Sequence, residues 1–310
     1  MDEFALIQRY FARLTPPSPN VLLGIGDDCA LLAPPAGRSL AVSIDSQVEG
    51  VHFPVGAPAR QVGSRVACCA LSDLAAMGAE PLWATLALTL PKADTQWLEG
   101  FAEGLASVLR RFNVALVGGD TTSGPLSITL QVHGSVSPEH ALRRSGAQVG
   151  DRIYVTGYLG DGAAALALLQ GRIEVPASAQ AYLTERFYAP EPQIEVGLRL
   201  AGLASSAIDI SDGLLADLGH ILARSQVGAR LELTALPLNP CWAAQVEPES
   251  ARCWALSGGD DYQLCFTFAA DQTPPVAATL IGVITEELGI LGVEPGGETV
   301  LTGGGFAHFR

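Results

Sequence analysis

The N-terminal part of the chain alternates between stretches with helical spacing of apolar residues and apolar, strand-like runs. Residues 3–14 (EFALIQRYFARL) predict a helix that ends in the Pro-rich loop TPPSPN. Two β-rich runs follow, residues 21–32 and 39–53, separated by a PPAG turn. The pattern then predicts a helix, a strand, a helix and two strands, at residues 59–77, 82–90, 95–112, 114–120 and 126–136. This β-β-α-β-α-β-β order is typical of an α/β unit with helices packed on a mixed sheet.

The hydrophobic periodicity lapses around residues 138–150 (PEHALRRSGAQVG), and we place a domain boundary there. The sequence therefore predicts an N-terminal domain of residues 1–137 and a C-terminal domain of residues 138–310. The second half restarts with a strand, the Gly-rich loop YLGDG and an Ala-rich helix, and two more helices follow. A strand-loop-helix unit at residues 205–226 and several strands complete the chain. The expected fold class is α/β (α+β), with two domains of mixed sheets and helices packed on them.

Composition and charge narrow the range of functions. The chain of 310 residues is 48% hydrophobic, and none of its uncharged apolar runs approaches the roughly 20 residues of a transmembrane helix. Its start is acidic and amphipathic, unlike a secretory signal, so we expect a cytoplasmic protein. The formal charge of −14 argues against nucleic acid and against an anionic membrane as partners. The six cysteines form no CxxC pair, which favours reduced core residues over a zinc site or disulfides.

Lysine usage restricts how the chain can hold a phosphate group. Lys92 is the only lysine, and the P-loop sequence GxxxxGK[ST] does not occur. A phosphate must therefore be bound by arginine, by backbone N–H groups or by a metal ion.

Aspartates follow small residues at the ends of several apolar runs. Taken singly, each has the ordinary interpretation of a turn former. Taken together, strand ends of one sheet would converge, and the gathered carboxylates would need cations or protons to neutralise them. Oxygen ligands without an accompanying His/Cys set favour Mg²⁺ or Mn²⁺ over zinc. Asp73, within the apolar helical run ALSDLAAMG, supports a metal site because a buried carboxylate needs a partner. The strand-end aspartates are Asp27 and Asp28 in GIGDD, Asp45 in SID, Asp120 in GGD, Asp209 and Asp212 in AIDISDG, and Asp260 and Asp261 in GGDD.

Other residues near these aspartates are candidates for binding an anion. Ser211 or Asp212 can cap the following helix, whose N-terminal N–H groups then face a phosphate, although a plain N-cap explains the segment equally well. Gly118 and Gly119 allow a phosphate to approach the backbone closely. The Arg143–Arg144 pair is a candidate phosphate clamp, although such pairs are more often solvated. His52 is either structural or a ligand.

Several long motifs resemble the thiamine-monophosphate kinase family of the aminoimidazole ribonucleotide synthetase superfamily. The resemblance covers nearly the whole chain, and its most specific motifs are ALSDLAAMGA and DISDGLLADLGHI. It also includes GIGDDCALL, DSQVEGVHF, VGGDTTSGPLSITL, RSGAQVGDRIYVTG, ALSGGDDYQLCF and the terminal GGFAHF. The resemblance implies an aminoimidazole ribonucleotide synthetase-like fold and a homodimer. It also implies ATP- and Mg²⁺-dependent phosphorylation of thiamine monophosphate to thiamine diphosphate.

The resemblance also implies roles for individual residues. Asp120 and Asp212 would be catalytic, and Gly119, Asp120, Arg144 and Ser211 would contact ATP. The substrate would meet His52, Asp260 and Phe306. The metal ligands would be Asp28, Ser43, Ile44 through its backbone, Asp45, Asp73, Asp120, Asp209 and Asp212. Two residues depart from the usual pattern: GGDDYQ stands where the family has GGEDYE, and Phe306 where it has Tyr or Trp.

The expected mechanism is direct in-line transfer, because the acceptor phosphate is already ionised at neutral pH and needs no strong general base. Three alternatives stay open at this point. One is a different ATP-dependent reaction on the same scaffold, such as purine-precursor ring closure or selenophosphate synthesis. Another is a two-metal phosphohydrolase, and the third is a non-catalytic Mg–nucleotide sensor.

Overall fold

The computed structural model describes residues 3–15, 17–302 and 304–305. The chain separates into two compact units: Met1–Leu74 with Ala79–Pro138, and Ala75–Gly78 with Glu139–Arg310. Whether the parts on either side of residue 137 fold independently stays a prediction. No helix in the described part of the chain combines the length and apolar character needed to cross a membrane.

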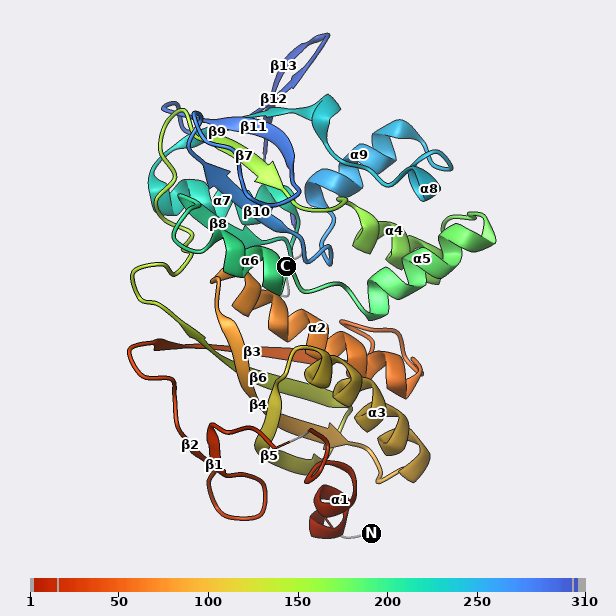
Figure 1. The fold of residues 1–310 in the computed structure, drawn as a ribbon. Helices are drawn as coiled ribbons and strands as arrows, with labels where there is room; N and C mark the ends of the chain where they lie inside the picture. The colour runs from red at the N-terminus through yellow and green to blue at the C-terminus, as the bar shows by residue number, and fades with distance from the viewer. Residues whose placement is uncertain (1–2, 16, 303, 306–310) are drawn as a thin grey trace. The chain divides into compact units, whose positions relative to one another are not determined.

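The first unit is built on a four-stranded mixed sheet with the strand order β3-β6-β4-β5 (Figure 1). β4 and β5 run parallel, and the other pairs are antiparallel. Strands β3 and β5 are therefore the two edges. The elements of this unit are α1 (Glu3–Tyr10), β1 (Val21–Leu23), β2 (Leu31–Leu32), β3 (Ser39–Val48), α2 (Ala59–Ala76), β4 (Glu80–Leu90), α3 (Thr95–Arg111), β5 (Ala115–Ser123) and β6 (Ser127–Val136).

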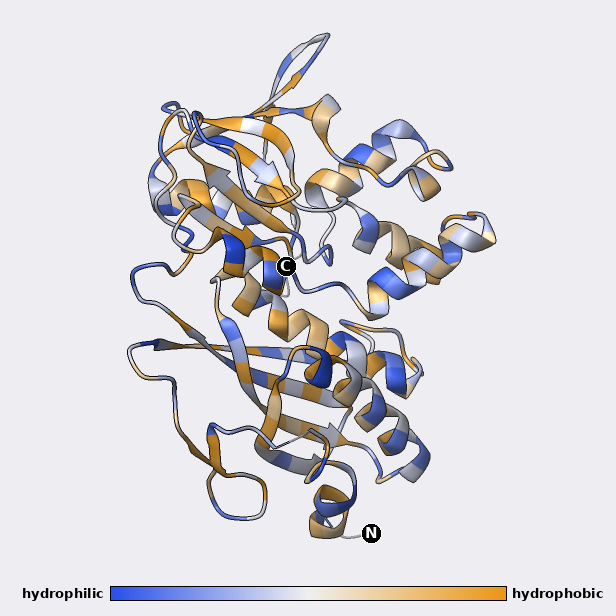
Figure 2. Ribbon diagram, in the orientation of Figure 1, coloured by the Kyte–Doolittle hydropathy of each residue, from blue (hydrophilic) through white to orange (hydrophobic). Residues whose placement is uncertain are grey.

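The two faces of this sheet differ in what covers them. Leu86, Leu88, Ile128 and Leu130 are buried on one face, which belongs to the core of the unit. Helices α2 and α3 supply the rest of that core, and Figure 2 shows apolar and hydrophilic residues alternating along α3. Because strand side chains alternate between faces, the intervening residues point to the opposite, outer face.

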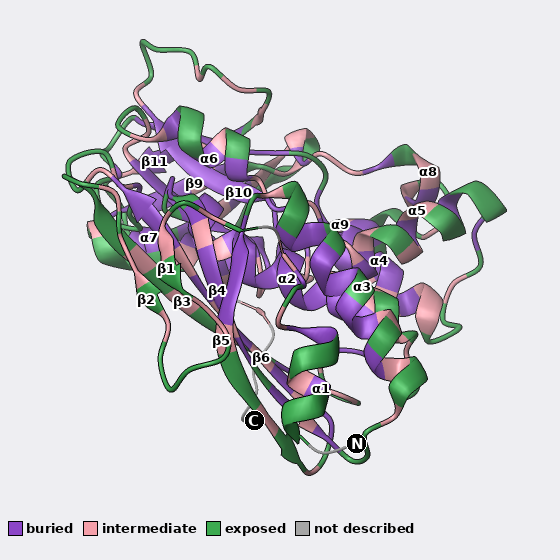
Figure 3. Ribbon diagram, turned by 60° about the horizontal axis from the view of Figure 1, so that its bottom comes forward, coloured by how far each residue is buried: buried purple, intermediate pink, exposed green. Residues whose placement is uncertain are grey.

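The outer face is poorly covered along β3. Leu40, Val42 and Ile44 alternate along that strand and are 46%, 54% and 64% exposed. Figure 3 shows β3 mainly exposed or half-buried, while β4, on the far side of β6, is mainly buried. Three β-branched or aliphatic side chains in a row on an edge strand form an apolar patch that an isolated chain leaves in water.

Two glycines let α2 and α3 pack backbone to backbone. A Cβ at Gly104 would lie 1.9 Å from the carbonyl oxygen of Arg60, and one at Gly63 would lie 2.2 Å from that of Phe101. No side chain fits at either position, so these glycines fix the distance of α2 from α3. Since α2 carries Asp73, this packing helps to position a candidate ligand.

The second unit is a seven-stranded sheet in the order β13-β12-β9-β11-β7-β10-β8, with β12 and β9 parallel and the remaining pairs antiparallel. Its core joins α7 to the sheet through Ile153, Val155, Ile208, Leu218 and Ile284. The elements are β7 (Arg152–Val155), α4 (Asp161–Leu169), α5 (Ala177–Tyr188), α6 (Ile194–Leu200), β8 (Ser206–Asp209), α7 (Leu214–Ser225), β9 (Gly228–Glu232), the 3₁₀ turn η1 (Leu233–Ala235), α8 (Pro240–Ala243), α9 (Pro248–Ser257), β10 (Leu264–Phe268), β11 (Thr279–Thr285), β12 (Gly289–Glu294) and β13 (Gly297–Leu301).

The α/β class with mixed sheets is confirmed, and several predicted bounds shift. The first helix ends at Tyr10 rather than Leu14, and the Leu14 carbonyl accepts hydrogen bonds from Arg110 of α3 at 3.0 and 2.7 Å. Residues 21–32 form two short antiparallel strands instead of one run. The loop YLGDG is shorter than predicted, because α4 already begins at Asp161.

Candidate active site

Ser43 and Asp73 join the first edge strand to helix α2. The Ser43 hydroxyl donates a hydrogen bond to Asp73 Oδ2 at 2.5 Å. Asp45 lies two residues further along β3 and therefore on the same face as Ser43. Three oxygen-bearing side chains predicted as metal ligands thus occupy one region of the first unit.

Ile44 points the other way. Its side chain is on the outer face and 64% exposed, so only its backbone carbonyl can join Ser43 and Asp45. This agrees with the expectation that Ile44 contributes through its main chain.

Asp28 lies in the turn between β1 and β2 and is exposed. Its backbone N–H donates to Asp27 Oδ1 at 2.8 Å, the local bond of an aspartate-rich turn. The ordinary turn-forming interpretation therefore holds for Asp27, while the Asp28 carboxylate is exposed and accessible.

Gly119 and Asp120 lie on the other edge strand, β5. Gly119 has φ 153°, and a Cβ there would come within 1.9 Å of the Leu86 carbonyl oxygen of β4. Only glycine fits, so the chain can present the exposed Asp120 directly after a close backbone contact.

Asp45 and Asp120 do not meet within one chain. Their strands lie at opposite edges of the sheet, three strand spacings or about 14 Å apart. Asp120 pairs with Ala87, which pairs with Thr129, which pairs with Ser46, so by register it leaves the sheet on the face opposite to Asp45. The expectation that strand-end aspartates converge at one sheet edge is wrong for this pair. Both residues lie inside strands that continue to Val48 and Ser123, and strand order separates them.

His52 follows β3 in a turn. Its Nδ1 accepts a hydrogen bond from the Val48 backbone N–H at 3.0 Å, so the neutral ring carries its proton on Nε2. The residue thus has the structural role that its lone position suggested, and this role orients the Nε2–H group.

In the second unit, Asp209 is buried at the end of edge strand β8, and Ser211 and Asp212 follow it in a half-buried loop. One carboxylate oxygen of Asp217 accepts hydrogen bonds from the backbone N–H groups of Ser211, Asp212 and Gly213 at 3.0, 3.0 and 3.1 Å. Burial raises the pKa of Asp217 to about 6, against the opposing effect of these N–H donors.

This arrangement corrects one expectation. Neither Ser211 nor Asp212 caps α7, because the N-cap residue is Gly213, with φ 122° and no side chain to offer. The N–H groups of the segment that leads into α7, those of Ser211, Asp212 and Gly213, are bonded to Asp217, and the expectation that the first N–H groups of the helix itself face an anion stays a prediction. Sequence reasoning missed Asp217, although the spacing of DISDGLLAD places an aspartate one helical turn after the loop.

Asp260 lies in a tight loop between α9 and β10. It has φ 68°, and its backbone N–H donates to the Ser211 carbonyl oxygen at 2.8 Å. The Tyr262 hydroxyl donates to Asp260 Oδ1 at 3.0 Å. The candidate substrate residue Asp260 is thereby joined directly to the candidate nucleotide residue Ser211.

Arg144 is exposed and precedes the second unit's first strand. Its neighbour Arg143 accepts a hydrogen bond from the Ala207 backbone N–H at 2.8 Å, so this segment runs alongside the edge strand β8. Arg144 is therefore attached to the strand that leads to Asp209. Phe306, the predicted aromatic contact, lies outside the described residues.

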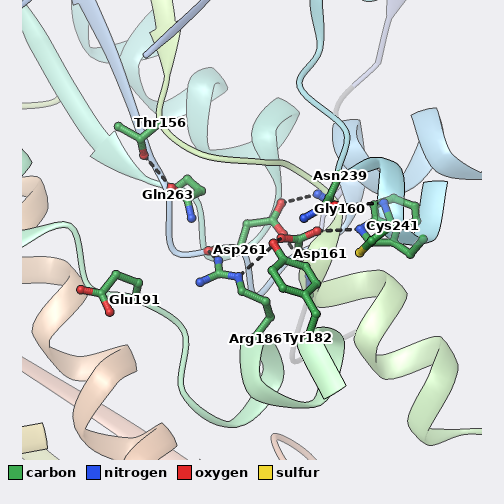
Figure 4. Close-up of polar contacts among 12 residues, drawn as sticks. Thr156, Gly160, Asp161, Tyr182, Arg186, Glu191, Asn239, Cys241, Asp261 and Gln263 are labelled. Atoms are coloured by element: carbon green, nitrogen blue, oxygen red, sulfur yellow. Dashed lines mark hydrogen bonds and ion pairs between the residues drawn. The ribbon is translucent and has the colours of Figure 1, made fainter. Parts of the chain in front are cut away.

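A buried polar cluster beside Asp260 was also missed by sequence reasoning (Figure 4). Asp161 accepts hydrogen bonds from the Trp242 ring N–H, at 2.6 Å, and from the Tyr182 hydroxyl, and Arg186 Nε lies 3.5 Å from it. Burial raises the pKa of Asp161 and, to about 8, that of Asp261. The GDG sequence indicated only a turn and GGDD only a strand-end aspartate pair, because the partners of Asp161 and Asp261 lie far away in the chain.

The oxygen atoms of the candidate ligands are of the kind that binds a divalent cation. In the described residues, no three His, Cys, Asp or Glu side chains form a cluster that would hold a metal ion. Ser43, Asp45 and Asp73 nevertheless supply hydroxyl and carboxylate oxygens from one face, which suits Mg²⁺. An Mg²⁺ ion usually keeps several waters and binds through one or two carboxylates plus phosphates, so the residues present fit it.

Comparisons with known proteins agree with this two-unit layout. Residues 26–136 match the family AIR synthase related protein, N-terminal domain, and residues 148–296 match AIR synthase related protein, C-terminal domain. Thiamine-monophosphate kinase of Escherichia coli (strain K12) is 48% identical over an alignment of 318 residues, covering 99% of this chain and 98% of that protein.

Two solved structures are similar over most of the chain. The thiamine-monophosphate kinase from Stenotrophomonas maltophilia K279a gives a TM-score of 0.86 at 45% identity, covering 94% of this chain and 96% of that one. The structure of AaThiL complexed with AMPPCP and TMP gives 0.81 at 29% identity, covering 89% of each chain.

The fold and both matched domains define a two-domain protein of the AIR synthase related class. The full-length identity then specifies the group within that class. The chain belongs to the thiamine-monophosphate kinase family.

Proposed function

We propose that this chain transfers the γ-phosphoryl group of ATP to the phosphate of thiamine monophosphate, giving thiamine diphosphate, with Mg²⁺ and without a covalent phospho-enzyme. The observation that carries the proposal is the 48% identity over 99% of the chain to a thiamine-monophosphate kinase. A relative that covers 89% of this chain was solved with AMPPCP, a non-hydrolysable ATP analogue, and TMP.

The acceptor determines what the protein must do. A phosphate monoester has its second pKa near 6, so thiamine monophosphate is mostly dianionic at neutral pH and needs no strong base. The residues must instead bring two anions together and align them, which is how most phosphoryl-transfer sites work. Because the chain has a single lysine, the cationic side chains available for this purpose are almost all arginines.

Backbone N–H groups at two helix starts of the second unit are also occupied. Before α7, the N–H groups of Ser211, Asp212 and Gly213 donate to Asp217. At α4, the N–H groups of Gly160 and Gly162 donate to Asp261. These N–H groups are therefore not available to a phosphate, which leaves arginine, metal and the remaining backbone N–H groups to hold it. This supports a metal-dependent site.

The oxygen ligands that we assign to the ions are Asp28, Ser43, Ile44 through its carbonyl, Asp45, Asp73, Asp120, Asp209 and Asp212. When bound, Mg²⁺ offsets charge on the entering and leaving phosphate oxygens. Asp120 and Asp212 are the residues we assign to catalysis, because each is an accessible carboxylate next to a candidate nucleotide contact, Gly119 or Ser211.

Gly119, Arg144 and Ser211 are the proposed ATP contacts, together with Asp120. Gly119 offers backbone without a side chain, Arg144 an exposed guanidinium, and Ser211 its hydroxyl group. Thiamine monophosphate is assigned to His52, Asp260 and Phe306. The orientation of His52 by Val48 and of Asp260 by Tyr262 supports two of these three contacts.

We also propose that the chain works as a homodimer in the cytoplasm. The exposed apolar row Leu40, Val42 and Ile44 needs a cover, and a second copy of the chain supplies the same surface under two-fold symmetry. Asp120 leaves the sheet on this same outer face, so it would face the other copy rather than the Ser43–Asp45–Asp73 group of its own chain. The cysteines in the described residues are all free, which suits a reducing compartment.

The test is to incubate purified protein with ATP, Mg²⁺ and thiamine monophosphate and to measure thiamine diphosphate by mass. We expect product only when all three are present, and none after chelation of the metal ions. Phosphate release from ATP without thiamine monophosphate would indicate a hydrolase instead. Asp120→Asn should abolish turnover while leaving the circular dichroism spectrum unchanged, and normal activity of that variant would remove Asp120 from the mechanism.

A further inference from the structure

The loop of residues 258–262 (GGDDY) connects two parts of the second unit that contribute to the proposed site. The Asp260 backbone N–H donates to the Ser211 carbonyl oxygen and that of Tyr262 to the Ile210 carbonyl oxygen, both at 2.8 Å. These bonds extend the β8–β10 pairing, in which Leu264 lies opposite Asp209. The loop is therefore attached to the segment that carries Ser211 and Asp212.

The same loop is attached on its other side to the start of helix α4. The Asp261 side chain is fully buried, and its two carboxylate oxygens accept hydrogen bonds from the backbone N–H groups of Gly160, at 2.7 Å, and Gly162, at 3.0 Å. The Asp261 carbonyl oxygen accepts a further bond from Arg186 Nη2 at 2.8 Å. Asp261 thus uses both its side chain and its backbone to hold the loop.

Arg186 and α4 are themselves held by Asp161. Figure 4 shows Asp161, Tyr182 and Arg186 converging beside Asp261. Asp161 accepts bonds from Tyr182 and from the Trp242 ring N–H and pairs with Arg186, and it is 1% exposed. A buried carboxylate with three donors is satisfied and therefore rigid.

Packing leaves the loop no alternative position. A Cβ at Gly162 would lie 2.4 Å from the Gly259 carbonyl oxygen and 2.7 Å from the Asp260 carbonyl carbon. A Cβ at Gly259 would lie 2.5 Å from the Ser211 carbonyl oxygen. Asp260 and Tyr262 have positive φ angles of 68° and 51°, which non-glycine residues adopt only when the surroundings hold them there.

We propose that Asp261 is a positioning residue: through its bonds to Gly160, Gly162 and Arg186 it fixes the loop that sets the distance between Asp260 and the Ser211–Asp212 segment. This inference rests on the proposed function, in which Asp260 meets thiamine monophosphate and Ser211 and Asp212 meet nucleotide and metal. Asp261 touches neither substrate. It acts by keeping Asp260 aligned with the Ser211–Asp212 segment.

A purely structural role makes a different prediction. If Asp261 only capped α4, its loss would lower the fraction of folded protein, and kcat would fall in proportion while both KM values stayed constant. If Asp261 positions the loop, the folded protein itself is misaligned. The KM for thiamine monophosphate then rises and kcat falls in protein that is fully folded.

The first experiment compares Asp261→Asn with Asp271→Asn. Asn can accept one of the two N–H bonds but presents an N–H₂ group to the other, so the loop start shifts. We expect the KM for thiamine monophosphate to rise and kcat to fall, each roughly tenfold or more, since small displacements of reacting groups have effects of that size. Asp271 is exposed, so the same chemical change there should alter neither constant. Unchanged KM values in folded Asp261→Asn protein would overturn the proposal.

A second pair of variants moves the loop without changing any charge. Gly162→Ala pushes directly on Gly259 and Asp260, and its expected kinetic signature is the same rise in KM and loss of kcat. Gly219→Ala is the control, because a Cβ at Gly219 in α7 meets nothing within 4 Å and the helix is only stabilised by it. This pair decides the question if Asp261→Asn does not fold, and wild-type kinetics for Gly162→Ala would again overturn the proposal.

Amide hydrogen exchange separates this inference from the proposed function. In the wild-type protein without substrates, residues 158–164, 209–213 and 258–263 should exchange slowly, and Asp261→Asn or Gly162→Ala should accelerate all three segments together. Suppose that wild-type protein made no thiamine diphosphate, but the variants still accelerated exchange in all three segments. The proposed function would then be wrong, while the positioning of the loop by Asp261 would be confirmed. If exchange became faster only in residues 158–164, Asp261 would only cap α4, and the proposed positioning role would be refuted.

Discussion

Asp45 of β3 and Asp120 of β5 lie on the two edge strands of one sheet and leave it on opposite faces. With both assigned to the metal site, the arrangement predicts that each site combines Asp45 from one protomer with Asp120 from the other. Asp45→Asn and Asp120→Asn should each be inactive alone. Mixing the two after subunit exchange should restore about a quarter of wild-type turnover, because half of the dimers are mixed and each has one intact site.

The control for this mixing experiment is a combination of Asp45→Asn with Asp73→Asn. Ser43 bonds Asp73 within the same chain, so both changes damage the same group and should not complement each other. Subunit exchange is confirmed by mass. If the Asp45/Asp120 mixture then showed no recovery of turnover, Asp120 would contribute to the site of its own chain or to no site.

The Ser43–Asp73 hydrogen bond predicts a change in magnesium requirement. Ser43→Ala removes a hydroxyl group that is itself a proposed ligand and that orients the Asp73 carboxylate, and even loss of an orienting partner typically weakens metal sites at least about tenfold. The Mg²⁺ concentration for half-maximal turnover should rise by about that factor, with kcat at saturating Mg²⁺ much less affected. Ser46→Ala is a matched control, since Ser46 lies on the same strand but on the outer face, bonded to Thr129. Equal shifts in both variants would contradict a specific role for Ser43.

Removal of the Asp217 carboxylate should loosen the nucleotide loop. Asp217→Ala leaves the N–H groups of Ser211, Asp212 and Gly213 without their acceptor. We expect the free energy of unfolding to fall by roughly 1–3 kcal/mol. The KM for ATP should rise in the protein that remains folded, measured where circular dichroism shows it intact. Asp271→Ala, an exposed substitution, should change neither quantity, and an unaltered KM for ATP in Asp217→Ala would limit Asp217 to stability.

The buried carboxyl of Asp261 makes stability depend on pH. Its pKa is raised to about 8 by burial, against the opposing effect of the Gly162 and Gly160 N–H groups, while Asp161 raises it and Arg186 lowers it. An unfolded aspartate titrates near 4. Between these values the folded protein retains a proton that the unfolded chain has released. The free energy of unfolding should therefore fall as pH rises from about 4 to about 8, by up to roughly 1.4 kcal/mol per pH unit.

The measurement is urea unfolding of wild type and Asp261→Asn near pH 5 and near pH 7.5. Burial also raises the pKa values of Asp161 and Asp217. In the wild-type protein, the decrease of the free energy of unfolding with pH therefore includes their contributions, which have the same sign. The difference between wild type and Asp261→Asn in this pH dependence of the free energy of unfolding gives the contribution of Asp261. Parallel slopes would mean that the native carboxyl titrates as it does in the unfolded chain.

The sequence predicted the helices of the first unit well because their signals are local. Residues 59–77 and 95–112 were expected to be helical, and α2 and α3 span Ala59–Ala76 and Thr95–Arg111. Asp94 shows why: its side chain accepts the Gln96 and Trp97 N–H groups, an N-cap that can be recognised within four residues of sequence.

The candidate site was less predictable because it depends on which strands are neighbours. Asp73 was assigned to the metal site from its apolar surroundings, and the structure places it against Ser43. The separation of Asp45 from Asp120 follows from the order β3-β6-β4-β5, which no local pattern encodes. Asp161 escaped notice, and Asp261 was noticed only as a strand-end aspartate, for the same reason: their partners Tyr182, Arg186 and Trp242 come from distant segments.

The two carboxylates that occupy the starts of α4 and α7 have a consequence for nucleotide recognition. A triphosphate arriving alone would find the N–H groups of Gly160, Gly162 and Ser211 to Gly213 already bonded to aspartate side chains, where many nucleotide-binding proteins present bare amide dipoles. Affinity for free ATP should then be low, and affinity for the magnesium complex high. By thermodynamic linkage, nucleotide occupancy would then rise with the concentration of free magnesium, and binding of the cation and binding of the nucleotide would strengthen each other.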